Sequence, residues 1–266
     1  AEDGIRDSVG SRGLGDVYKR QERTLQQMAK ILEETDRDRR QAAWSAAAER
    51  RLVDAVEIDS IYDELLANRH RIAENAGFAN YRDYIFVARH RFDYTPRDCE
   101  AFHKAAARCC VPLQHTLDDE RRLHLGLDRL RPWDMGVDVA GREPLRPFGE
   151  VDEMVAGTSR MFHRMAPRFG ARFDSLRDGD SLDLDSRKGK APGGYQVQFD
   201  VVRKPFIFMN ATGMQRDLET MVHESGHAFH SMLGADLPLV DHRDPPIEFA
   251  EVASMTMELF THQYLD

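Results

Sequence analysis

The sequence has little cysteine, with Cys99, Cys109 and Cys110 as the only three in 266 residues. Thiols that are so few and so close together cannot build the disulfide framework that stabilises many small secreted domains. No C-x-x-C spacing is present, which also excludes the common cysteine motifs for structural zinc and for haem attachment. We therefore expect a protein of a reducing compartment, the cytoplasm.

Basic excess and long apolar runs are also missing. The formal net charge is −9 and the sequence pI is about 5.7, whereas a general nucleic-acid binder needs a basic face to displace counterions from phosphates. No apolar run approaches the roughly 18 residues that would span a bilayer. Neither nucleic acid nor a membrane is therefore an expected partner, while 41% apolar residues are enough for a globular core.

Both ends of the sequence lack the usual boundary signals. Residues 1–21 have no initiating Met, contain four glycines and show no apolar period. We interpret them as a non-native leader and exclude them from the fold, with a flexible native loop as the alternative. The last residues, ELFTHQYLD, continue a helical pattern without a Gly or Pro stop signal. The expected fold is therefore incomplete at both ends.

Helical periodicity dominates the first half of the chain. TLQQMAKILEE and IDSIYDELLANRHRIAENA repeat apolar residues three and four positions apart, which is typical of amphipathic helices. Thr95 and Pro96 are suited to the N-cap and first turn of a further helix. Six Pro and Gly residues between 132 and 149 mark the clearest break in the chain. We therefore predict a helical N-terminal region over residues 22–147.

The second predicted region, residues 148–266, differs in character. GGYQVQFDVVRKPFIFMNAT contains the only convincing strand signals, β-branched and aromatic residues that predict a short hairpin or two edge strands. Helices should follow over about Gln215 to Leu233 and from about Pro246 onward, where proline is tolerated at a helix start. The two regions together predict a mainly α fold.

The second region contains an H-E-x-x-H motif in TMVHESGHAFH, residues 220–230. On a helix, His223 and His227 stand one above the other about 6 Å apart, so both can reach one zinc ion. Glu224 lies beside them, where a carboxylate can take a proton from metal-activated water. Such a motif occurs by chance in roughly 3 of 100 shuffled chains, so the interpretation needs a third ligand.

The helix from Pro246 offers two carboxylates as the third ligand. Glu248 and Glu251 lie on one face of this helix, and we favour Glu251 because its neighbours in EFAEVASMTMELF are nearly all apolar. A carboxylate among apolar residues is costly to bury without a partner. Three protein ligands leave the fourth position of a catalytic zinc site open.

Further residues are candidates for orienting the ligands. Glu219 lies one turn before His223 and can accept the second ring N–H of a metal-bound histidine, with an ordinary surface carboxylate as the alternative. Glu258 and His230 are weaker candidates for the same role, and we do not expect His230 to be a ligand. The remaining candidates, which lack ligand spacing and which we interpret as ordinary surface or packing histidines, are His90, His103, His115, His124 and His163.

These residues together carry a family resemblance. ETMVHESGHAFH followed by EFAEVASMTMELF resembles the thimet oligopeptidase and oligoendopeptidase F family of zinc metallopeptidases. DLDSRKGKAPGGYQ, KPFIFMNATG and NRHRIAENAGFANYRDYIF are similar to further segments of that family, so the resemblance covers about residues 25–266. It implies a multi-helix body split by a channel, with a small β-sheet next to the zinc-binding helix.

The resemblance also implies roles for single residues. His223, His227 and Glu251 match the zinc ligands, Glu224 matches the general base and Glu219 matches the orienting glutamate. The family carries in addition a tyrosine and histidine group that binds the substrate carbonyl oxygen, and its segment has no counterpart up to residue 266. The resemblance thus predicts a fragment of an enzyme that binds one Zn²⁺ per chain.

The expected function is hydrolysis of short peptides by a zinc-dependent endopeptidase. The strand around Phe206 to Ala211 can hold a peptide backbone by edge pairing, although an ordinary buried strand is an equal alternative. A catalytically weak or inactive helical module that only binds a partner is the alternative function. Other chemistry finds no support, because the stretch from Asp174 lacks the ligand pattern of a calcium loop and Ser225 lacks a nucleophile-elbow motif. The sequence does not indicate an oligomeric state.

Overall fold

The computed structural model describes residues 5–6 and 22–264, which divide into two compact units. One unit comprises residues 35–142, and the other combines the described residues up to 34 with those from 143 onward. The sequence predicts, by contrast, that residues 22–34 belong to the helical N-terminal region. The predicted leader, residues 1–21, lies outside the described residues except for strand β1 (Ile5–Arg6), which pairs antiparallel with β2 (Glu22–Arg23).

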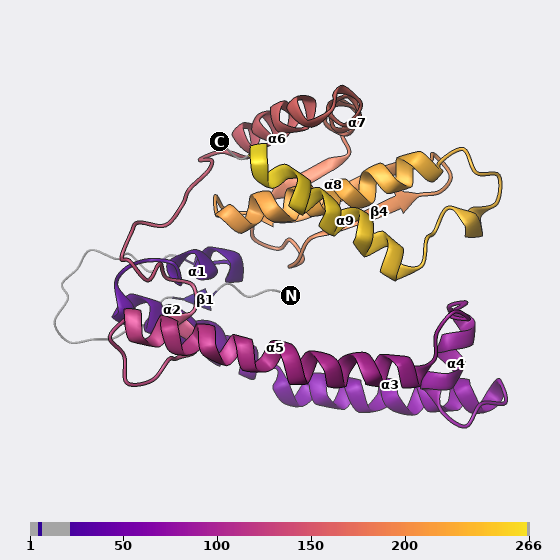
Figure 1. Cartoon of the computed structure of the whole chain (residues 1–266), viewed down its shortest axis with the longest axis horizontal. Helices are drawn as coiled ribbons and strands as arrows, with labels where there is room; N and C mark the ends of the chain where they lie inside the picture. Colours follow the sequence, from indigo (N-terminus) through magenta and orange to yellow (C-terminus); the bar gives the residue numbers. More distant parts are fainter. Residues whose placement is uncertain (1–4, 7–21, 265–266) are drawn as a thin grey trace. The chain divides into compact units, whose positions relative to one another are not determined.

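The unit of residues 35–142 is helical (Figure 1). Its 3₁₀ turn η1 (Pro132–Asp134) is tied to the first helix because the fully buried Asp134 accepts two 2.9 Å hydrogen bonds from Arg37. The predicted cap is confirmed, since the last helix begins at Pro96 with Thr95 as N-cap. The helices are α2 (Arg37–Leu52), α3 (Ala55–Asn75), α4 (Tyr81–Ala88) and α5 (Pro96–His124).

The other unit combines helices with a three-stranded sheet of order β3-β5-β4 (Figure 1). Strand β5 pairs parallel with β3 and antiparallel with β4, with Gln196 of β4 opposite Ile207 of β5. The strands are β3 (Leu182–Asp185), β4 (Tyr195–Phe199) and β5 (Lys204–Ala211). The helices are α1 (Leu25–Ile31), α6 (Val151–Met165), α7 (Pro167–Asp178), α8 (Gln215–Gly234) and α9 (Ile247–Thr261), with 3₁₀ turns at Val240–His242 and His262–Tyr264.

The sheet confirms the predicted hairpin and favours the ordinary buried strand, one of the two alternatives for residues 206–211. Because β5 has a hydrogen-bonded partner on each side, the segment Phe206 to Ala211 has no free edge to which a peptide can add. Within the described residues, β4 has a partner on one side only. The sequence did not predict β3, because its LDLD motif is only four residues long and contains aspartate in place of the β-branched and aromatic residues that favour strands.

An aromatic core fixes α8 against α6, α7 and the sheet. The rings of Phe162, Phe173 and Phe229, one from each of these helices, are almost fully buried, and the Phe162 ring lies 5.5 Å and 5.0 Å from the other two. Ile207 of β5 and Met221 of α8 join the same cluster. Burying each such side chain stabilises the fold by about 1.5–3 kcal/mol. This packing fixes the rotation of α8 about its axis, and therefore the direction in which its opposite face points.

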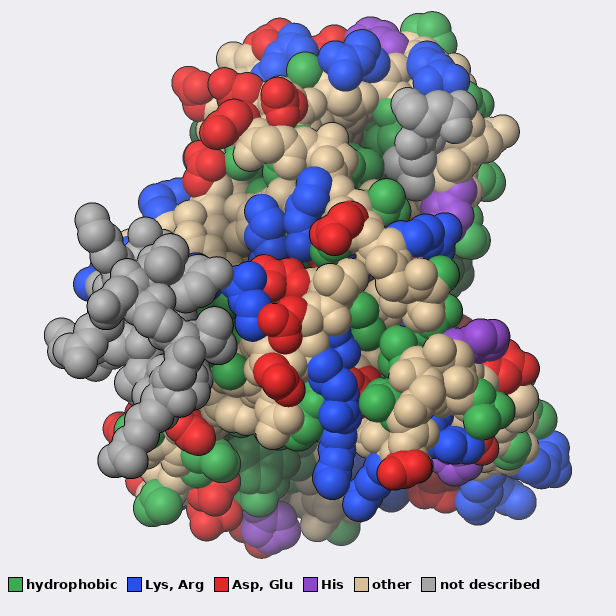
Figure 2. Space-filling view, turned by 90° about the vertical axis from the view of Figure 1, so that its left-hand side faces the viewer, with side chains coloured by type: hydrophobic (Ala, Val, Ile, Leu, Met, Phe, Trp, Pro, Cys, Tyr) green, Lys and Arg blue, Asp and Glu red, His purple; other side chains and the backbone are tan. Residues whose placement is uncertain are grey.

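The described surface carries side chains of both charge signs (Figure 2). Acidic and basic side chains both occur on the face drawn in Figure 2, as expected for a chain without basic excess. Within the described range, no helix is both long and apolar enough to cross a membrane. All three cysteines, Cys99, Cys109 and Cys110, are free thiols.

Candidate metal centre

Helix α8 presents His223 and His227 from consecutive turns. Their Nε2 atoms lie 3.2 Å apart, with ring centroids 4.9 Å from each other and rings nearly perpendicular. Both side chains are mostly shielded from solvent, with exposed fractions of 26% and 16%. At this distance one ring can donate a hydrogen bond to the other, or the two lone pairs can bind one cation.

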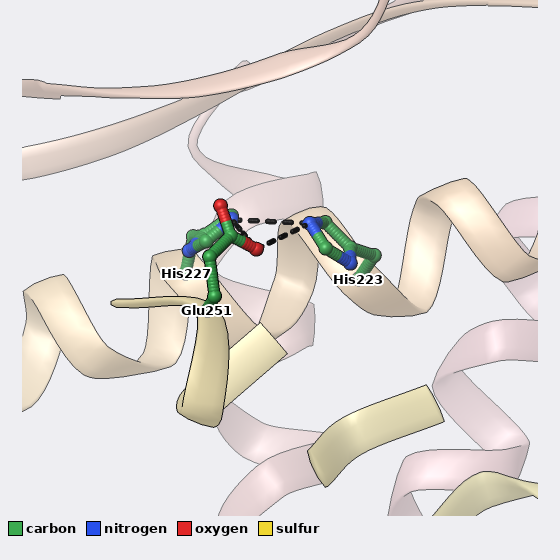
Figure 3. Close-up of side chains that lie close together, drawn as sticks. All are labelled: His223, His227 and Glu251. Atoms are coloured by element: carbon green, nitrogen blue, oxygen red, sulfur yellow. Dashed lines mark hydrogen bonds and ion pairs between the residues drawn. The ribbon is translucent and has the colours of Figure 1, made fainter. Parts of the chain in front are cut away.

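Helix α9 adds the carboxylate of Glu251. Its Oε2 lies 3.4 Å from His223 Nε2 and 3.8 Å from His227 Nε2, and the three side chains point toward one another (Figure 3). Glu248, the other predicted candidate, is exposed and does not belong to this group. Across the described residues, the histidines, cysteines and acidic side chains form no other group with metal-ligand spacing.

The spacing of the three donor atoms fits a tetrahedral zinc site. A tetrahedral Zn²⁺ with ligand distances of about 2.0–2.2 Å separates its ligands by about 3.3–3.6 Å. The donor separations of 3.2, 3.4 and 3.8 Å lie close to this range. Two imidazoles and one carboxylate are also a ligand set found in catalytic zinc sites. The residues present therefore fit the ion that the motif implies.

Helix α9 also orients both histidines. Glu258 Oε1 lies 2.6 Å from His223 Nδ1, and His227 forms a hydrogen bond with the backbone of Ala250. Of the two glutamates that the sequence offered for orienting His223, Glu219 is exposed, whereas Glu258, the weaker candidate, contacts the ring. The position of Glu258 agrees with helix geometry, because it follows Glu251 by seven residues, two helical turns along the same face.

Glu224 lies beside the histidines and is buried, with 7% of its surface exposed. Burial raises the pKa of its carboxyl above the ordinary value, while the nearby charge of His223 and a hydrogen bond donated by the Gln196 backbone oppose that shift. Burial likewise lowers the pKa of His227 below its ordinary value, with the charge of His223 acting in the same direction. A neutral imidazole is the form that binds a metal.

The remaining histidines take no part in the donor group. His230 has a buried Nδ1 without a hydrogen-bond partner. His163 forms a hydrogen bond with Asp174, and His124 forms one with the backbone of Glu120. The same Asp174, which begins the stretch that the sequence excluded as a calcium loop, also accepts a hydrogen bond from Ser159, so its carboxylate is engaged within the fold.

The known proteins that this chain resembles are peptidases. The family model of Peptidase family M3 matches residues 30–266. A chromosomal oligoendopeptidase F of Lactococcus lactis subsp. cremoris is 37% identical over 149 residues, which cover 56% of this chain and 24% of that protein. Group B oligopeptidase PepB of Streptococcus agalactiae is 27% identical over 149 residues, with the same coverage of both.

Solved structures extend the likeness to most of the chain. A Bacillus anthracis str. Ames protein described as an oligoendopeptidase F superposes with a TM-score of 0.88 at 29% identity, over 94% of this chain and 46% of that one. PZ peptidase A, solved with an inhibitor, superposes with a TM-score of 0.88 at 30% identity, over 93% and 44%. The chain thus spans about a quarter of the length of the curated relatives and under half of these solved chains.

Proposed function

The chain belongs to peptidase family M3, and on that premise we propose that it carries the zinc centre of an endopeptidase that cleaves short peptides. The observation that carries the proposal is the convergence of His223, His227 and Glu251 around one point, with the buried Glu224 beside them. Catalytic zinc sites combine three protein ligands with a neighbouring base in this way. One Zn²⁺ per chain is the proposed cofactor.

The proposed chemistry divides between the ion and Glu224. Bound zinc lowers the pKa of water and polarises a carbonyl group. Glu224 accepts the proton of the attacking water and later donates it to the leaving amine. The raised pKa of Glu224 makes its carboxylate a stronger base for the first step, and general acid–base catalysis is most efficient when the pKa lies near the working pH.

Strand β4 is the proposed support for the substrate backbone. Because the Gln196 N–H is directed at Glu224, the β4 edge away from β5 faces the site. In an antiparallel ladder, residues two apart direct their backbone groups to the same side, so Gln198 offers its backbone groups along this edge. An extended peptide can pair there by adding a strand. The peptide would then lie next to Glu224.

The test combines zinc content with peptide hydrolysis. We expect about one zinc per chain and loss of that zinc in the His223→Ala, His227→Ala double variant. Glu224→Gln should retain zinc and lose about 10²- to 10⁴-fold in turnover of a quenched fluorescent peptide, whereas the exposed Glu219→Gln should retain turnover. Hydrolysis is measured on the chain and on a version extended to the length of its relatives. Stoichiometric zinc in the double variant, or full turnover in Glu224→Gln, would contradict the proposal.

A further inference from the structure

Helices α8 and α9 touch backbone to backbone at Gly226. A Cβ atom added at this residue would lie 2.6 Å from Ser254 Cα and 2.8 Å from the carbonyl oxygen of Ala253. Both are backbone atoms of α9, so neither can move aside as the end of a flexible side chain can. Any residue larger than glycine would push the two helices apart. Gly226 stands directly before the ligand His227, so this contact lies at the proposed metal site.

Ser254 lies at the same contact and reaches the third ligand. Its side chain is fully buried, and its Oγ lies 3.0 Å from both the backbone oxygen and Oε2 of Glu251. The hydroxyl donates its hydrogen to these oxygens. Oε2 is the same atom that lies 3.4 Å from His223 Nε2 and 3.8 Å from His227 Nε2. Ser254 therefore contacts the proposed ligand atom itself.

Glu251 needs such a support more than the two histidines do. Its side chain is 41% exposed, against 26% and 16% for His223 and His227. A long, half-exposed carboxylate samples several rotamers, and binding a metal in one of them costs conformational entropy. The Ser254 hydroxyl restricts this freedom, while the Gly226 contact fixes how far Glu251 stands from the imidazoles.

We propose that Gly226 and Ser254 are positioning residues that set the zinc affinity of the site. Gly226 sets the separation of α8 and α9, and Ser254 holds Glu251 Oε2 at the position where it meets the two imidazole nitrogens. This inference rests on the proposed zinc function, since it assigns residues that act through a ligand of that site. Neither residue belongs to the group of proposed ligands.

Ser254→Ala isolates the hydroxyl. Removing a group that hydrogen-bonds a metal ligand typically weakens metal affinity about 10- to 100-fold, and we expect a loss of that size in zinc competition against a chelator of known affinity. Because Glu251 is half-exposed, the metal-free melting temperature should stay unchanged. Ser225→Ala is the matched control, since this serine is equally buried on α8 but its hydroxyl bonds only the Met221 backbone. A role in stability alone would lower the metal-free melting temperature instead.

Gly226→Ala isolates the helix contact. We expect at least a 10-fold loss of zinc affinity, together with a changed visible spectrum of the Co²⁺-loaded chain, because the carboxylate moves relative to the imidazoles. Gly157→Ala on α6 is the matched control, since its added Cβ would meet only the end of the Arg160 side chain, 3.7 Å away. If Gly226→Ala fails to fold, judged by circular dichroism, Ser254→Ala still decides the case.

The outcomes separate this inference from the proposed function. Wild-type chain that binds no zinc at the two histidines would overturn the proposed function. Zinc binding by wild type with an affinity within twofold in Ser254→Ala would overturn the positioning role alone. A 10-fold loss in Ser254→Ala, with Ser225→Ala and Gly157→Ala unchanged, would support it.

Discussion

Glu258 determines, at the scale of single residues, which nitrogen His223 presents to the site. Its carboxylate lies 2.6 Å from Nδ1, so Nε2 of the same ring faces His227 and Glu251. A carboxylate that accepts the Nδ1 proton fixes the tautomer whose Nε2 lone pair is free, which is the form that binds zinc. Glu219 is one turn away on α8 itself, but it is exposed. The packing of α9 against α8 therefore decides between the two glutamates.

We predict that Glu258→Ala weakens zinc affinity by about 10- to 100-fold, as is typical for the partner of a ligand histidine. Glu219→Ala should leave the affinity unchanged, because this exposed side chain is not the partner of His223 Nδ1. Chelator competition on the two variants and on wild type measures both values. Equal losses in the two variants would mean that the carboxylates act only through their general charge.

At the scale of elements, the sequence predicts those features that local pattern determines. Helix α8 begins at Gln215 as predicted and ends at Gly234, one residue beyond the predicted end, and α9 begins just after Pro246. Apolar period and proline placement fix these bounds locally. Local pattern also predicts the part of the candidate site that lies on α8, because His223 and His227 are four residues apart.

Strand order and the contacts between helices have no such local signal. The hairpin pattern does not reveal that β3 pairs with the outer side of β5, because a parallel neighbour is chosen by tertiary packing. For the same reason the sequence left open whether residues 206–211 form a free edge or an ordinary buried strand. Glu258 was named from the sequence only as a weaker candidate, and Ser254 and the Gln196 backbone were not predicted as parts of the site, since each reaches it from an element other than α8.

The charged residues in and after β3 make a contribution to stability that depends on pH. Lys190, almost fully buried, donates 3.0 Å hydrogen bonds to the backbone and the carboxylate of Asp183. The same carboxylate accepts a hydrogen bond from Arg187, which lowers the pKa of Asp183 to about 2. A pKa below its unfolded value of 3.8 stabilises the fold above pH 3.8, and this contribution is lost as the pH falls toward 2.

We therefore predict that Asp183→Asn lowers the free energy of unfolding at pH 7 by about 1.5–3 kcal/mol, the usual range for a hydrogen bond to a charged group. The difference from wild type should shrink as the pH falls from 4 to 2, because the wild-type carboxylate then becomes protonated. Urea unfolding of both proteins at several pH values measures this. A difference that stays constant down to pH 2 would show that Asp183 acts through packing instead of charge.

At the scale of the whole molecule, the two units bury very different amounts of apolar surface. The main hydrophobic cluster lies entirely within residues 148–257. Among the described residues of the unit 35–142, only Ala43, Ala73 and Val137 are buried hydrophobic side chains. Several large apolar residues of this unit are instead exposed, among them Val56, Ile58, Leu113, Leu117 and Leu123.

This distribution predicts that zinc protects one unit and not the other. A ligand stabilises only the cooperative unit that must unfold to release it, by about 2.7 kcal/mol at a free concentration of 100 times Kd. The proposed ligands lie on α8 and α9, which pack with the main core, whereas α3 and α5 belong to a unit with little buried apolar surface. Unequal cores give unequal opening free energies.

Hydrogen exchange followed by mass spectrometry is the measurement for this prediction. Without zinc, amides of α3 and α5 should exchange faster than those of α8 and β5. Saturating zinc should slow exchange in α8, α9 and β5 by roughly 100-fold, the factor that corresponds to about 2.7 kcal/mol, and leave α3 and α5 unchanged. The His223→Ala, His227→Ala double variant should show no response to zinc. Equal slowing in all helices would instead show that both units unfold as one cooperative body, since zinc bound at α8 and α9 would then have to dissociate before α3 or α5 could open.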